Sequence, residues 1–348
     1  MIRLPGVSII ILNYNGIDDT ITCLKSLLKT DYPDFEILVL DNGSTSNEAK
    51  IIQRSINSKK LKVFKIGQNL GFTGGNNWLV RRVKSKYFVL LNNDTIVDKF
   101  WLKRLVGFAQ RKKDGAVFQP KIKLSYDQKR FDYAGACGGY IDYFGYPFTR
   151  GRIFESREID RGQYDNPARI FWASGAVMLI KKSILEDEDY LFDDDFFNYM
   201  EEIDFCWRLM NKGYRIYSVP QSVVYHKVAG SAGKNLLKKR FWEHRNNVLL
   251  MLKNLERTDL LIFLTIRPMF ELLTYVSYIV QLKFKFALSL FLAHLTLFYM
   301  VPKFVKKRTG NHKKLKDLPV FKGSIVVSYF LENKKTFKSL GFNARHGL

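Results

Sequence analysis

The stretch Val7-Ser-Ile-Ile-Ile-Leu-Asn-Tyr-Asn-Gly16 decides the fold, because a short apolar run ends abruptly in polar residues. A continuous apolar run of this length, bounded by turn residues, is typical of a strand that is buried on both faces. Ile17, Ile21 and Leu24 follow at helical spacing, so the strand leads into an amphipathic helix. The run is too short for the core of a secretion signal, and we interpret it as structural.

The same pattern recurs three times in the first hundred residues. Phe35–Leu40, Lys62–Ile66 and Tyr87–Leu91 are short apolar runs, and each ends in or near a polar or glycine-rich cluster. Strands that alternate with helices indicate a mostly parallel α/β sheet. Because ligands bind at the carboxyl ends of the strands in such sheets, distant residues should converge on one crevice. These residues are Asn13, Asp41, Gly71 and Asp94.

The segment that follows is predicted in less detail. The glycine-rich residues 120–170 receive no clear assignment. Ile170–Ile180 is predicted to be a single buried strand, and Tyr199–Asn211 a helix closed by Gly213. Two short strands are predicted at Arg215–Val219 and Val223–His226.

The positive charge of the chain is concentrated at its end. The 348 residues carry a formal charge of +23, and residues 231–348 alone hold 22 Lys and Arg against 6 Asp and Glu. Such an excess predicts a polyanionic partner. The cations accompany apolar segments rather than aromatic residues on a sheet, and no RNA-binding motif is visible, which disfavours nucleic acid.

The last third contains three apolar stretches broken by charged residues and proline. The longest has about 16 residues, fewer than the roughly 20 that a spanning helix needs. Interfacial amphipathic helices or a shallow hairpin at an anionic membrane are therefore predicted, and an ordinary helical subdomain with a solvated basic face is the alternative. The stretches are Leu260–Leu264, Leu272–Leu282 and Phe286–Val301. We expect a catalytic domain over residues 1–235 and this membrane-associating region over 236–348.

The three cysteines are odd in number and far apart. Cys23, Cys137 and Cys206 contain no Cys-x-x-Cys pair, so neither a disulfide framework nor a zinc site is indicated. This fits a reducing compartment.

Two clusters have residue types suited to holding a divalent cation. Asn92-Asn93-Asp94 follows a predicted strand, where a carboxylate can bind a hard cation that neutralises a diphosphate. The alternative is a turn that caps the helix from Asp98. His226 ends another strand, and imidazole with carboxylate favours Mn²⁺ over Mg²⁺. A structural histidine is the alternative there.

Two further clusters concern proton transfer and phosphate binding. Glu201-Glu202-Ile-Asp204 opens a predicted helix among aromatic residues, where desolvation raises a carboxyl pKa and suits a general base. The alternative is that these acids only complement the helix dipole. The glycines of Gly71–Gly75 precede a helix and let backbone N–H groups approach a phosphate, unless they form a plain turn.

These motifs in their order resemble an inverting family-2 glycosyltransferase of the rhamnosyltransferase-like branch, over about residues 5–230. The stretches that carry the resemblance are Val7–Gly16, Glu36–Ser44, Asn69–Asn77, Leu90–Thr95, Trp172–Ala176, Met200–Arg208 and Val224–His226.

The resemblance implies a GT-A fold and a role for each matching residue. The nucleoside is expected at Asn13, Asn15 and Asp41, and the donor pocket beside Asn69, Gly71, Gly74 and Asn77. The metal motif corresponds to Asn92, Asn93 and Asp94, with His226 as the late metal ligand. Glu202 corresponds to the acceptor-activating base, flanked by Glu201 and Asp204, and Trp172 lies on the acceptor side. Asn92 replaces an Asp of the stricter metal pattern, and Glu202 stands where many relatives have Asp.

The implied function is transfer of a sugar from a nucleotide-diphosphate donor to a glycan or lipid-linked hydroxyl, in cell-surface polysaccharide synthesis. A dTDP-rhamnose-like or UDP-sugar donor, a Mn²⁺ or Mg²⁺ cofactor and the cytoplasmic face of the membrane are expected. The alternative is an inactive, membrane-anchored nucleotide-sugar-binding protein, against which the carboxylates of Asp94, Glu202 and Asp204 speak.

Overall fold

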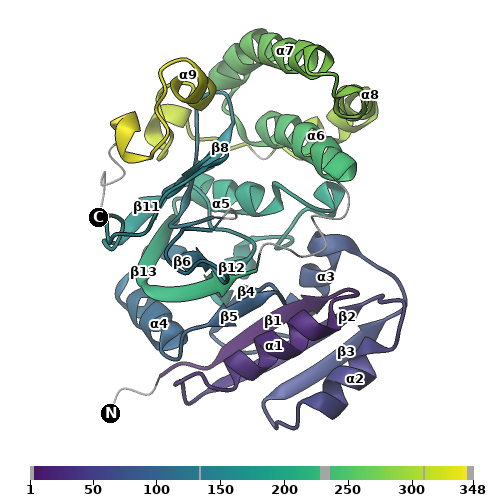
Figure 1. The fold of residues 1–348 in the computed structure, drawn as a ribbon, viewed down its shortest axis with the longest axis vertical. Helices are drawn as coiled ribbons and strands as arrows, with labels where there is room; N and C mark the ends of the chain where they lie inside the picture. Colours follow the sequence, from purple (N-terminus) through teal and green to yellow (C-terminus); the bar gives the residue numbers. More distant parts are fainter. Residues whose placement is uncertain (1–3, 133–134, 228–235, 309, 343–348) are drawn as a thin grey trace.

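The computed structural model describes residues 4–132, 135–227, 236–308 and 310–342. A nine-stranded sheet lies at its centre, with strand order β11-β13-β6-β12-β4-β1-β2-β3 and β5 paired to β13 (Figure 1). The first four strands confirm the four predicted runs. They are β1 (Val7–Asn13), β2 (Phe35–Asn42), β3 (Leu61–Ile66) and β4 (Tyr87–Leu91).

Parallel pairing in this half brings polar strand ends to one edge. β1 lies between β2 and β4, and β2 pairs with β3, all in parallel. The connecting helices are α1 (Ile17–Leu27), α2 (Glu48–Ser55) and α3 (Gly71–Val80), and α4 (Trp101–Arg111) follows β5 (Thr95–Val97).

Burial on both faces explains the unbroken apolar runs. Ile9 and Ile11 belong to one core cluster with side chains of α1, α2 and α4. Ile10 belongs to a second cluster on the other face, together with side chains of α3 and of the helices that follow. Alternate residues of a strand point to opposite faces, so a strand inside a three-layer fold needs apolar residues throughout.

The other half of the sheet is mixed, and it corrects two strand predictions. Ile170–Ile180 is not one strand: β11 (Ala168–Ile170) pairs with β13, whereas β12 (Val177–Lys181) pairs with β4 and β6 (Gly115–Leu124). A turn closed by the Val177 N–H on the Ser174 carbonyl separates them. Conversely, β13 (Arg215–His226) is one strand, with a register irregularity between Val219 and Val223.

The glycine-rich segment forms a small second sheet of β7 (Gly139–Ile141), β8 (Pro147–Thr149), β9 (Arg152–Ile153) and β10 (Ser156–Arg157). The C-terminal segment packs against it, because the Phe321 N–H donates to the Ile141 carbonyl and the Ser156 and Tyr329 hydroxyls are bonded. Tyr329 belongs to α9 (Ile325–Phe330). Short 3₁₀ turns complete the chain at Lys182–Asp187, Asp194–Phe196, Leu315–Asp317 and Lys338–Leu340.

Three helices of the last third stack outward from α5 (Glu201–Asn211). Helix α6 (Leu236–Asn254) contacts α5, and α7 (Arg257–Val280) and α8 (Phe284–Lys306) form an outer hairpin on α6 (Figure 1). The first two predicted apolar stretches are therefore parts of one helix that contains Pro268.

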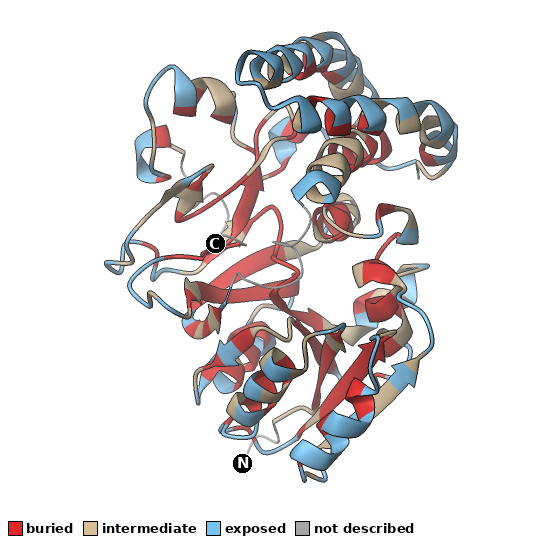
Figure 2. Ribbon diagram, turned by 45° about the vertical axis from the view of Figure 1, so that its right-hand side comes forward, coloured by how far each residue is buried: buried red, intermediate tan, exposed pale blue. Residues whose placement is uncertain are grey.

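Both hairpin helices are long and apolar enough to cross a membrane, by length and composition alone. They are mostly exposed, as Figure 2 shows, since only 17% and 22% of their most apolar windows are buried. The division at residue 235 remains a prediction, and residues from both sides of it share one core cluster, among them Phe205, Leu249 and Phe304.

Candidate active site

A histidine between two carboxylates joins the two halves of the sheet. His226 ends β13, and its Nε2 lies 3.0 Å from Oδ1 of Asp94, which follows β4. On the other side of the ring, Nδ1 lies 3.0 Å from Oδ2 of the fully buried Asp132. β13 pairs with β5, so His226 faces Thr95 in register and is held beside Asp94.

The geometry of this pair fits a cation site. Asp94 Oδ1 and His226 Nε2 are both buried, and apart from each other at 3.0 Å neither atom has a hydrogen-bond partner. A carboxylate behind the ring, as Asp132 provides, is the usual support of a metal-binding imidazole. Among the described residues no group of three or more His, Cys, Asp or Glu side chains is arranged to hold a metal ion. A cation here would have two protein ligands and would take its others from the substrate.

The charges of the pair stabilise each other. Burial by itself would raise the pKa of Asp94, but His226 outweighs it and the pKa is lowered. Burial would lower the pKa of His226, but Asp132 and Asp94 raise it to about 10. The two groups form an ion pair in the metal-free protein, and a bound cation would replace the imidazole proton.

The ends of β1 and β2 are organised by short polar contacts. Asn13 and Asp41 are partners in register, and both are fully buried. The Asn13 amide donates to Glu48 at 2.7 Å and its oxygen accepts from Thr20 at 2.7 Å. The Asp41 carboxylate accepts backbone N–H groups of Ser44 and Ala49, both at 3.2 Å. These two side chains shape the turn after β2 and the start of α2.

Asn15 is the exposed member of this group. It has a positive φ of 49°, and its side-chain oxygen accepts from the backbone and hydroxyl of Thr45 at 2.9 and 3.0 Å. The following metal-motif residues are used structurally as well. The Asn93 amide donates to Thr20 at 2.9 Å, and the Asn92 carbonyl accepts from Thr95.

The glycines after β3 were predicted to precede a helix, and the structure corrects this prediction. Helix α3 begins at Gly71, so Gly74 and Gly75 lie inside it. A Cβ on Gly75 would lie 2.9 Å from the Leu12 side chain, and one on Gly74 would lie 2.9 Å from Leu70. The glycines therefore allow close packing of α3 on β1, and their backbone is helical.

Gly71 and Asn69 fix the start of α3. Gly71 has φ +72°, and a Cβ there would meet the Phe197 ring at 2.7 Å. Asn69 accepts from the Gly71 N–H at 2.8 Å. At the other side of the helix, the Asn77 amide donates to the Phe192 carbonyl at 2.7 Å and to Asp194. Helix α3 thus connects the donor side of the sheet to the segment before α5.

The two glutamates at the start of α5 have perturbed acidities. Glu201 is buried, Glu202 is partly exposed, and one carboxylate oxygen of each lacks a hydrogen-bond partner. Burial raises the pKa of Glu202 to about 7, while its backbone hydrogen bonds oppose the shift. Burial and then the charge of Glu202 raise the pKa of Glu201 well above its usual range. The pair therefore loses its first proton near neutral pH, chiefly from Glu202.

The segment before these glutamates is strained. Phe197, Tyr199 and Met200 all have positive φ, at 61°, 69° and 73°. Non-glycine residues in this region cost roughly 1–3 kcal/mol each and persist only where their surroundings hold them. The Phe197 carbonyl accepts from the N–H groups of Phe72 and Thr73, so the strained segment also contacts α3.

Helix α6 holds the strained segment. The buried Asn246 amide donates to three backbone carbonyls, at Phe196, Asn198 and Tyr199, over 3.0, 2.8 and 2.9 Å. Arg245 adds bonds to the carbonyls of Asp195 and Phe196. Glu201 and Glu202 are therefore positioned by a helix that follows them by more than thirty residues.

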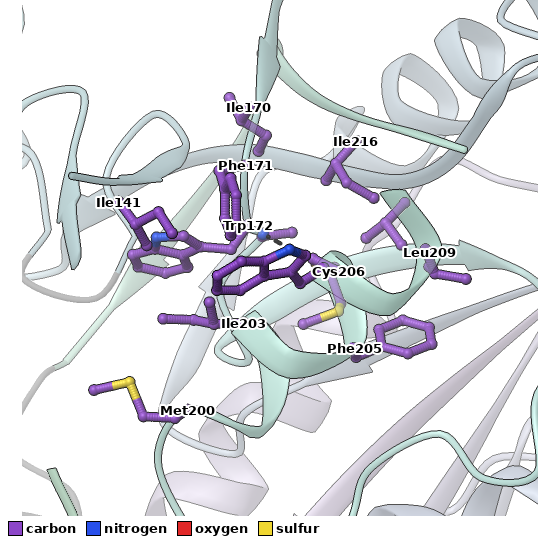
Figure 3. Packing of buried hydrophobic residues seen from close by; sticks show 14 of the residues in the cluster. Ile141, Ile170, Phe171, Trp172, Met200, Ile203, Phe205, Cys206, Leu209 and Ile216 are labelled. Atoms are coloured by element: carbon purple, nitrogen blue, oxygen red, sulfur yellow. Dashed lines mark hydrogen bonds between the residues drawn. The ribbon is translucent and has the colours of Figure 1, made fainter. Parts of the chain in front are cut away.

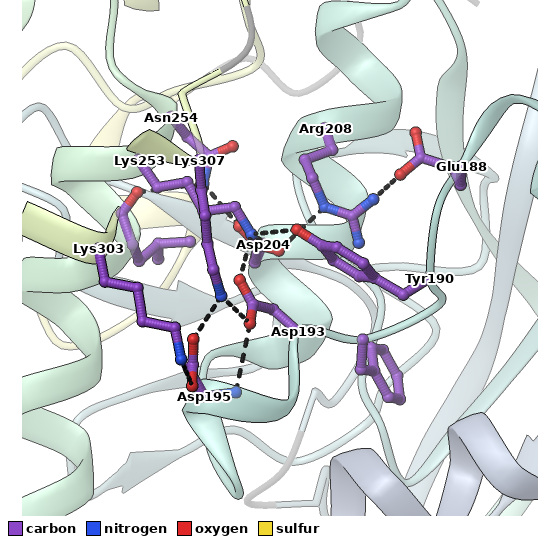
Figure 4. Close-up of polar contacts among 12 residues, drawn as sticks. Glu188, Tyr190, Asp193, Asp195, Asp204, Arg208, Lys253, Asn254, Lys303 and Lys307 are labelled. Carbon is purple, nitrogen blue, oxygen red and sulfur yellow. Dashed lines mark hydrogen bonds and ion pairs between the residues drawn. The ribbon is translucent and has the colours of Figure 1, made fainter. Parts of the chain in front are cut away.

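Asp204 is engaged in a network of ion pairs and hydrogen bonds that joins α5 to α6 (Figure 4). It is fully buried and accepts from Lys253 at 2.9 Å, Asn254 at 2.8 Å and Arg208 at 3.0 Å. Lys253 also binds Asp193 at 2.9 Å. With its oxygens occupied, Asp204 anchors α5 to α6.

Trp172 lies in the hydrophobic core beside α5 (Figure 3). Its indole is 7% exposed and donates to the Tyr140 carbonyl at 3.0 Å. Gly139 leaves room for the ring, because a Cβ there would lie 2.0 Å from it. The structure does not place this side chain on an open acceptor surface.

Four residues of this region were not predicted from the sequence. Asp132 lies in the segment without assignment, and no local signal marks it. Asn246 and Lys253 are polar residues on the apolar side of a helix, which is a usable signal for a buried contact. Glu48, which binds Asn13, opens a helix four residues after Ser44.

Comparisons with known proteins agree with this geometry. The model of the family "Glycosyl transferase family 2" matches residues 8–186, just over half of the chain. The chain is 26% identical over 248 residues to the O-antigen biosynthesis protein RfbC of Myxococcus xanthus, covering 68% of this chain and 18% of that protein. It is also 26% identical over 235 residues to the poly-beta-1,6-N-acetyl-D-glucosamine synthase of Staphylococcus epidermidis, covering 66% and 52%. The chain thus spans about half or less of these relatives' length.

Solved structures show the same fold at low identity. GalNAc-T7 with UDP, GalNAc and Mn²⁺ has a TM-score of 0.57 at 16% identity, covering 74% of this chain and 49% of the other. The mannosyltransferase PcManGT of Pyrobaculum calidifontis with GDP-Man and Mn²⁺ has a TM-score of 0.52 at 14% identity, covering 88% and 85%. S. aureus TarS 1-349 with UDP has a TM-score of 0.51 at 18% identity, covering 74% and 70%. The family model that matches over half of the chain and the shared architecture lead to one assignment: the chain belongs to glycosyltransferase family 2 and has a GT-A fold.

Proposed function

We propose that this protein is an inverting transferase that moves a sugar from a nucleoside-diphosphate donor to a hydroxyl group of a glycan or lipid-linked acceptor. Its place would be cell-surface polysaccharide synthesis, as with the O-antigen and poly-N-acetylglucosamine relatives. The observation that carries the proposal is the glutamate pair at the start of α5, beside a loop that is bound to both α3 and α6.

Glu202 would act as the general base. Its pKa of about 7 leaves a substantial fraction of it ionised near neutral pH and makes it basic enough to take a hydroxyl proton. Attack of that hydroxyl on the anomeric carbon forms the new glycosidic bond and breaks the bond to the diphosphate. A single base on the acceptor side accords with inversion. Burial and the charge of Glu202 raise the pKa of Glu201, which favours the protonated form of Glu201 beside an ionised Glu202.

Asp94 and His226 would hold a divalent cation, Mn²⁺ or Mg²⁺. When bound, the cation neutralises the diphosphate and makes it a better leaving group. Asp132 orients the imidazole, and β13 keeps it at a fixed distance from β4. The nucleoside would lie beside Asn13, Asn15 and Asp41. The other wall of the donor pocket would come from the start and body of α3, with Asn69, Gly71, Gly74 and Asn77.

A donor screen tests the proposal. Calorimetric binding of UDP-, dTDP- and GDP-sugars is measured with and without Mn²⁺, on the native chain and on Asp94→Ala, with the exposed Asp31→Ala as control. We expect the native chain to bind one class of nucleotide sugar selectively and only with Mn²⁺. This binding should be lost in Asp94→Ala and retained in Asp31→Ala. Binding of none of the donors under any condition would refute the proposal.

The second candidate is a membrane-anchored nucleotide-sugar-binding protein without catalysis. The exposed apolar hairpin favours the membrane part of it. Glu202→Gln separates the two, because a binder would retain its full function. Product formation that disappears in Glu202→Gln while donor binding remains supports the enzyme.

A further inference from the structure

The hairpin of α7 and α8 has one face that is fastened to the rest of the protein. In α7, Arg267 donates to the Phe144 carbonyl at 2.7 Å and pairs with Glu271 at 2.6 Å. In α8, Ser289 donates to the Leu237 carbonyl at 2.8 Å, and Lys303 pairs with Asp195 at 2.6 Å. These contacts are spread along both helices, so the whole hairpin lies against α6 and the catalytic part.

The opposite face of the hairpin is apolar and exposed. Leu272 and Phe298 are 63% and 78% exposed. A patch of this extent on one side of two helices is far larger than the scattered apolar side chains of an ordinary surface. Its members are Leu261, Ile262, Leu264, Met269, Leu272, Leu273, Val276, Ile279, Val280, Leu288, Phe291, Leu292, Leu295, Phe298 and Tyr299.

Exposed cations stand at both ends of this patch. Arg257 begins α7 and Lys306 ends α8, at one end of the hairpin. Lys283 precedes α8 and Lys285 lies in its first turn, at the other end. Cations beside an exposed apolar face suit the headgroups of an anionic membrane, and the contacts of the fastened face decide the orientation.

We infer that the hairpin lies flat in one leaflet of an anionic phospholipid bilayer and does not cross it. This rests on the proposed lipid-linked acceptor, which would bring the enzyme to a membrane, and adds the orientation of the hairpin there. A spanning hairpin would have to swing its turn to the far interface and release the contacts that fasten both helices to the rest of the protein. It would also detach Arg267 from the Phe144 carbonyl and leave the charged Arg267–Glu271 pair facing lipid, where charged groups are rare and costly.

Depth measurements distinguish the two orientations. Leu261, Leu272 and Ile279 lie on one face of α7, and the outer two are separated by about 27 Å along the helix axis. Each is replaced in turn by a nitroxide-labelled cysteine in the full chain bound to vesicles of phosphatidylserine and phosphatidylcholine. The native Cys23, Cys137 and Cys206 are all buried, which keeps background labelling low.

Equal depths at the three positions, within a few ångströms, are expected for a flat helix. Depths that run from one interface through the midplane to the other would overturn the inference. At least tenfold weaker binding to pure phosphatidylcholine vesicles is expected as well, because the flanking cations contribute.

Two variants and one independent readout complete the test. Leu272→Glu should weaken vesicle binding at least tenfold, whereas Ile51→Glu, on the exposed side of α2, should leave it unchanged. Equal effects of both variants would overturn the inference. Donor binding is measured in the same preparations, so a protein that binds donor but no vesicle disproves the membrane placement alone, and the proposed function stands.

Discussion

The proposed donor side, at the ends of β1 and β2, and the proposed catalytic side, at the start of α5, are held together in different ways. On the donor side, polar side chains bind backbone close in sequence, as Asp41 does at Ser44 and Ala49. On the catalytic side the bonds cover long separations, such as Asn246 to the Asn198 carbonyl and Lys307 to Asp193. The first site is organised by its own motifs, and the second depends on helices from the C-terminal third.

The comparison also separates two uses of buried charge. Asp94 and His226 compensate each other's charge, and the two facing atoms, Oδ1 and Nε2, have no other hydrogen-bond partner. Asp193 and Asp204 are fully engaged by Lys253, which indicates anchoring rather than chemistry. Glu201 and Glu202 have no cationic partner among the causes of their shifts, so their pKa values rise. A carboxylate that is buried without a counter-charge is the better candidate for proton transfer.

The largest effect is expected from Glu202→Gln. Loss of a general base lowers kcat by about 10²- to 10⁴-fold. Donor affinity should change little, since the role concerns the acceptor proton. Steady-state kinetics and donor calorimetry measure both, with the exposed Glu186→Gln as matched control. Retained kcat would show that the catalytic side uses another base.

The same variant should become more stable at pH 8. A carboxyl whose pKa is raised from 4.5 to about 7 binds its proton more tightly when folded, so its contribution is present below 4.5 and is lost as pH rises through 7. Removing the charge should raise Tm at pH 8 by a few °C, on the order of 1–2 kcal/mol. In the native chain kcat/KM should fall below about pH 7. Thermal melts at pH 5 and pH 8 check the sign, and a larger gain at pH 5 would contradict it.

The next effect concerns the ion network. Lys253→Met leaves Asp193 and Asp204 buried without their shared cation, and breaking such a pair costs about 3–5 kcal/mol. Urea unfolding of the variant, beside Lys50→Met on the exposed side of α2, measures the loss. Equal stabilities would show that α5 does not need α6 as an anchor.

A smaller effect is expected from Asn246→Ala. Three carbonyls of the strained segment lose one donor, and the Phe196 carbonyl keeps its bond from Arg245, so the cost is about 1–3 kcal/mol. We expect kcat to fall about tenfold with KM for the donor changed less, because the segment positions Glu201 and Glu202. The exposed Asn57→Ala serves as control. Unchanged kcat despite lower stability would restrict Asn246 to a structural role.

The smallest effect tests the donor side. In Gly75→Ala the new Cβ would lie 2.9 Å from Leu12, and overpacking of this kind costs about 1–3 kcal/mol. At Gly67 no atom lies within 4 Å of the corresponding Cβ, so Gly67→Ala should be neutral or slightly stabilising. Denaturant midpoints of both variants measure the difference, and equal midpoints would exclude the packing role of Gly75.

The sequence by itself determined the strands and the family. The runs at Val7, Phe35 and Tyr87 are strands because burial on both faces demands apolar residues, and that pattern is local. The run at Lys62 forms the edge strand β3, which is only partly buried. The motif order also predicted which family model would match. The error at Ile170–Ile180 arose because two strands that pair with different neighbours share one apolar run, and periodicity carries no information on pairing partners.

Only the tertiary structure decided what each polar residue does. Asp94, Glu202 and Asp204 are all acidic side chains, and the sequence does not distinguish their roles. In the structure Asp94 faces an imidazole, Glu202 is desolvated without a counter-charge, and Asp204 is enclosed by Lys253, Asn254 and Arg208. Asp132, Asn246 and Lys253 became visible only when chain segments far apart in sequence came together. Acidity and hydrogen bonding depend on the surroundings of a group in space, and those surroundings here include residues more than a hundred positions away, such as Lys307 beside Asp193.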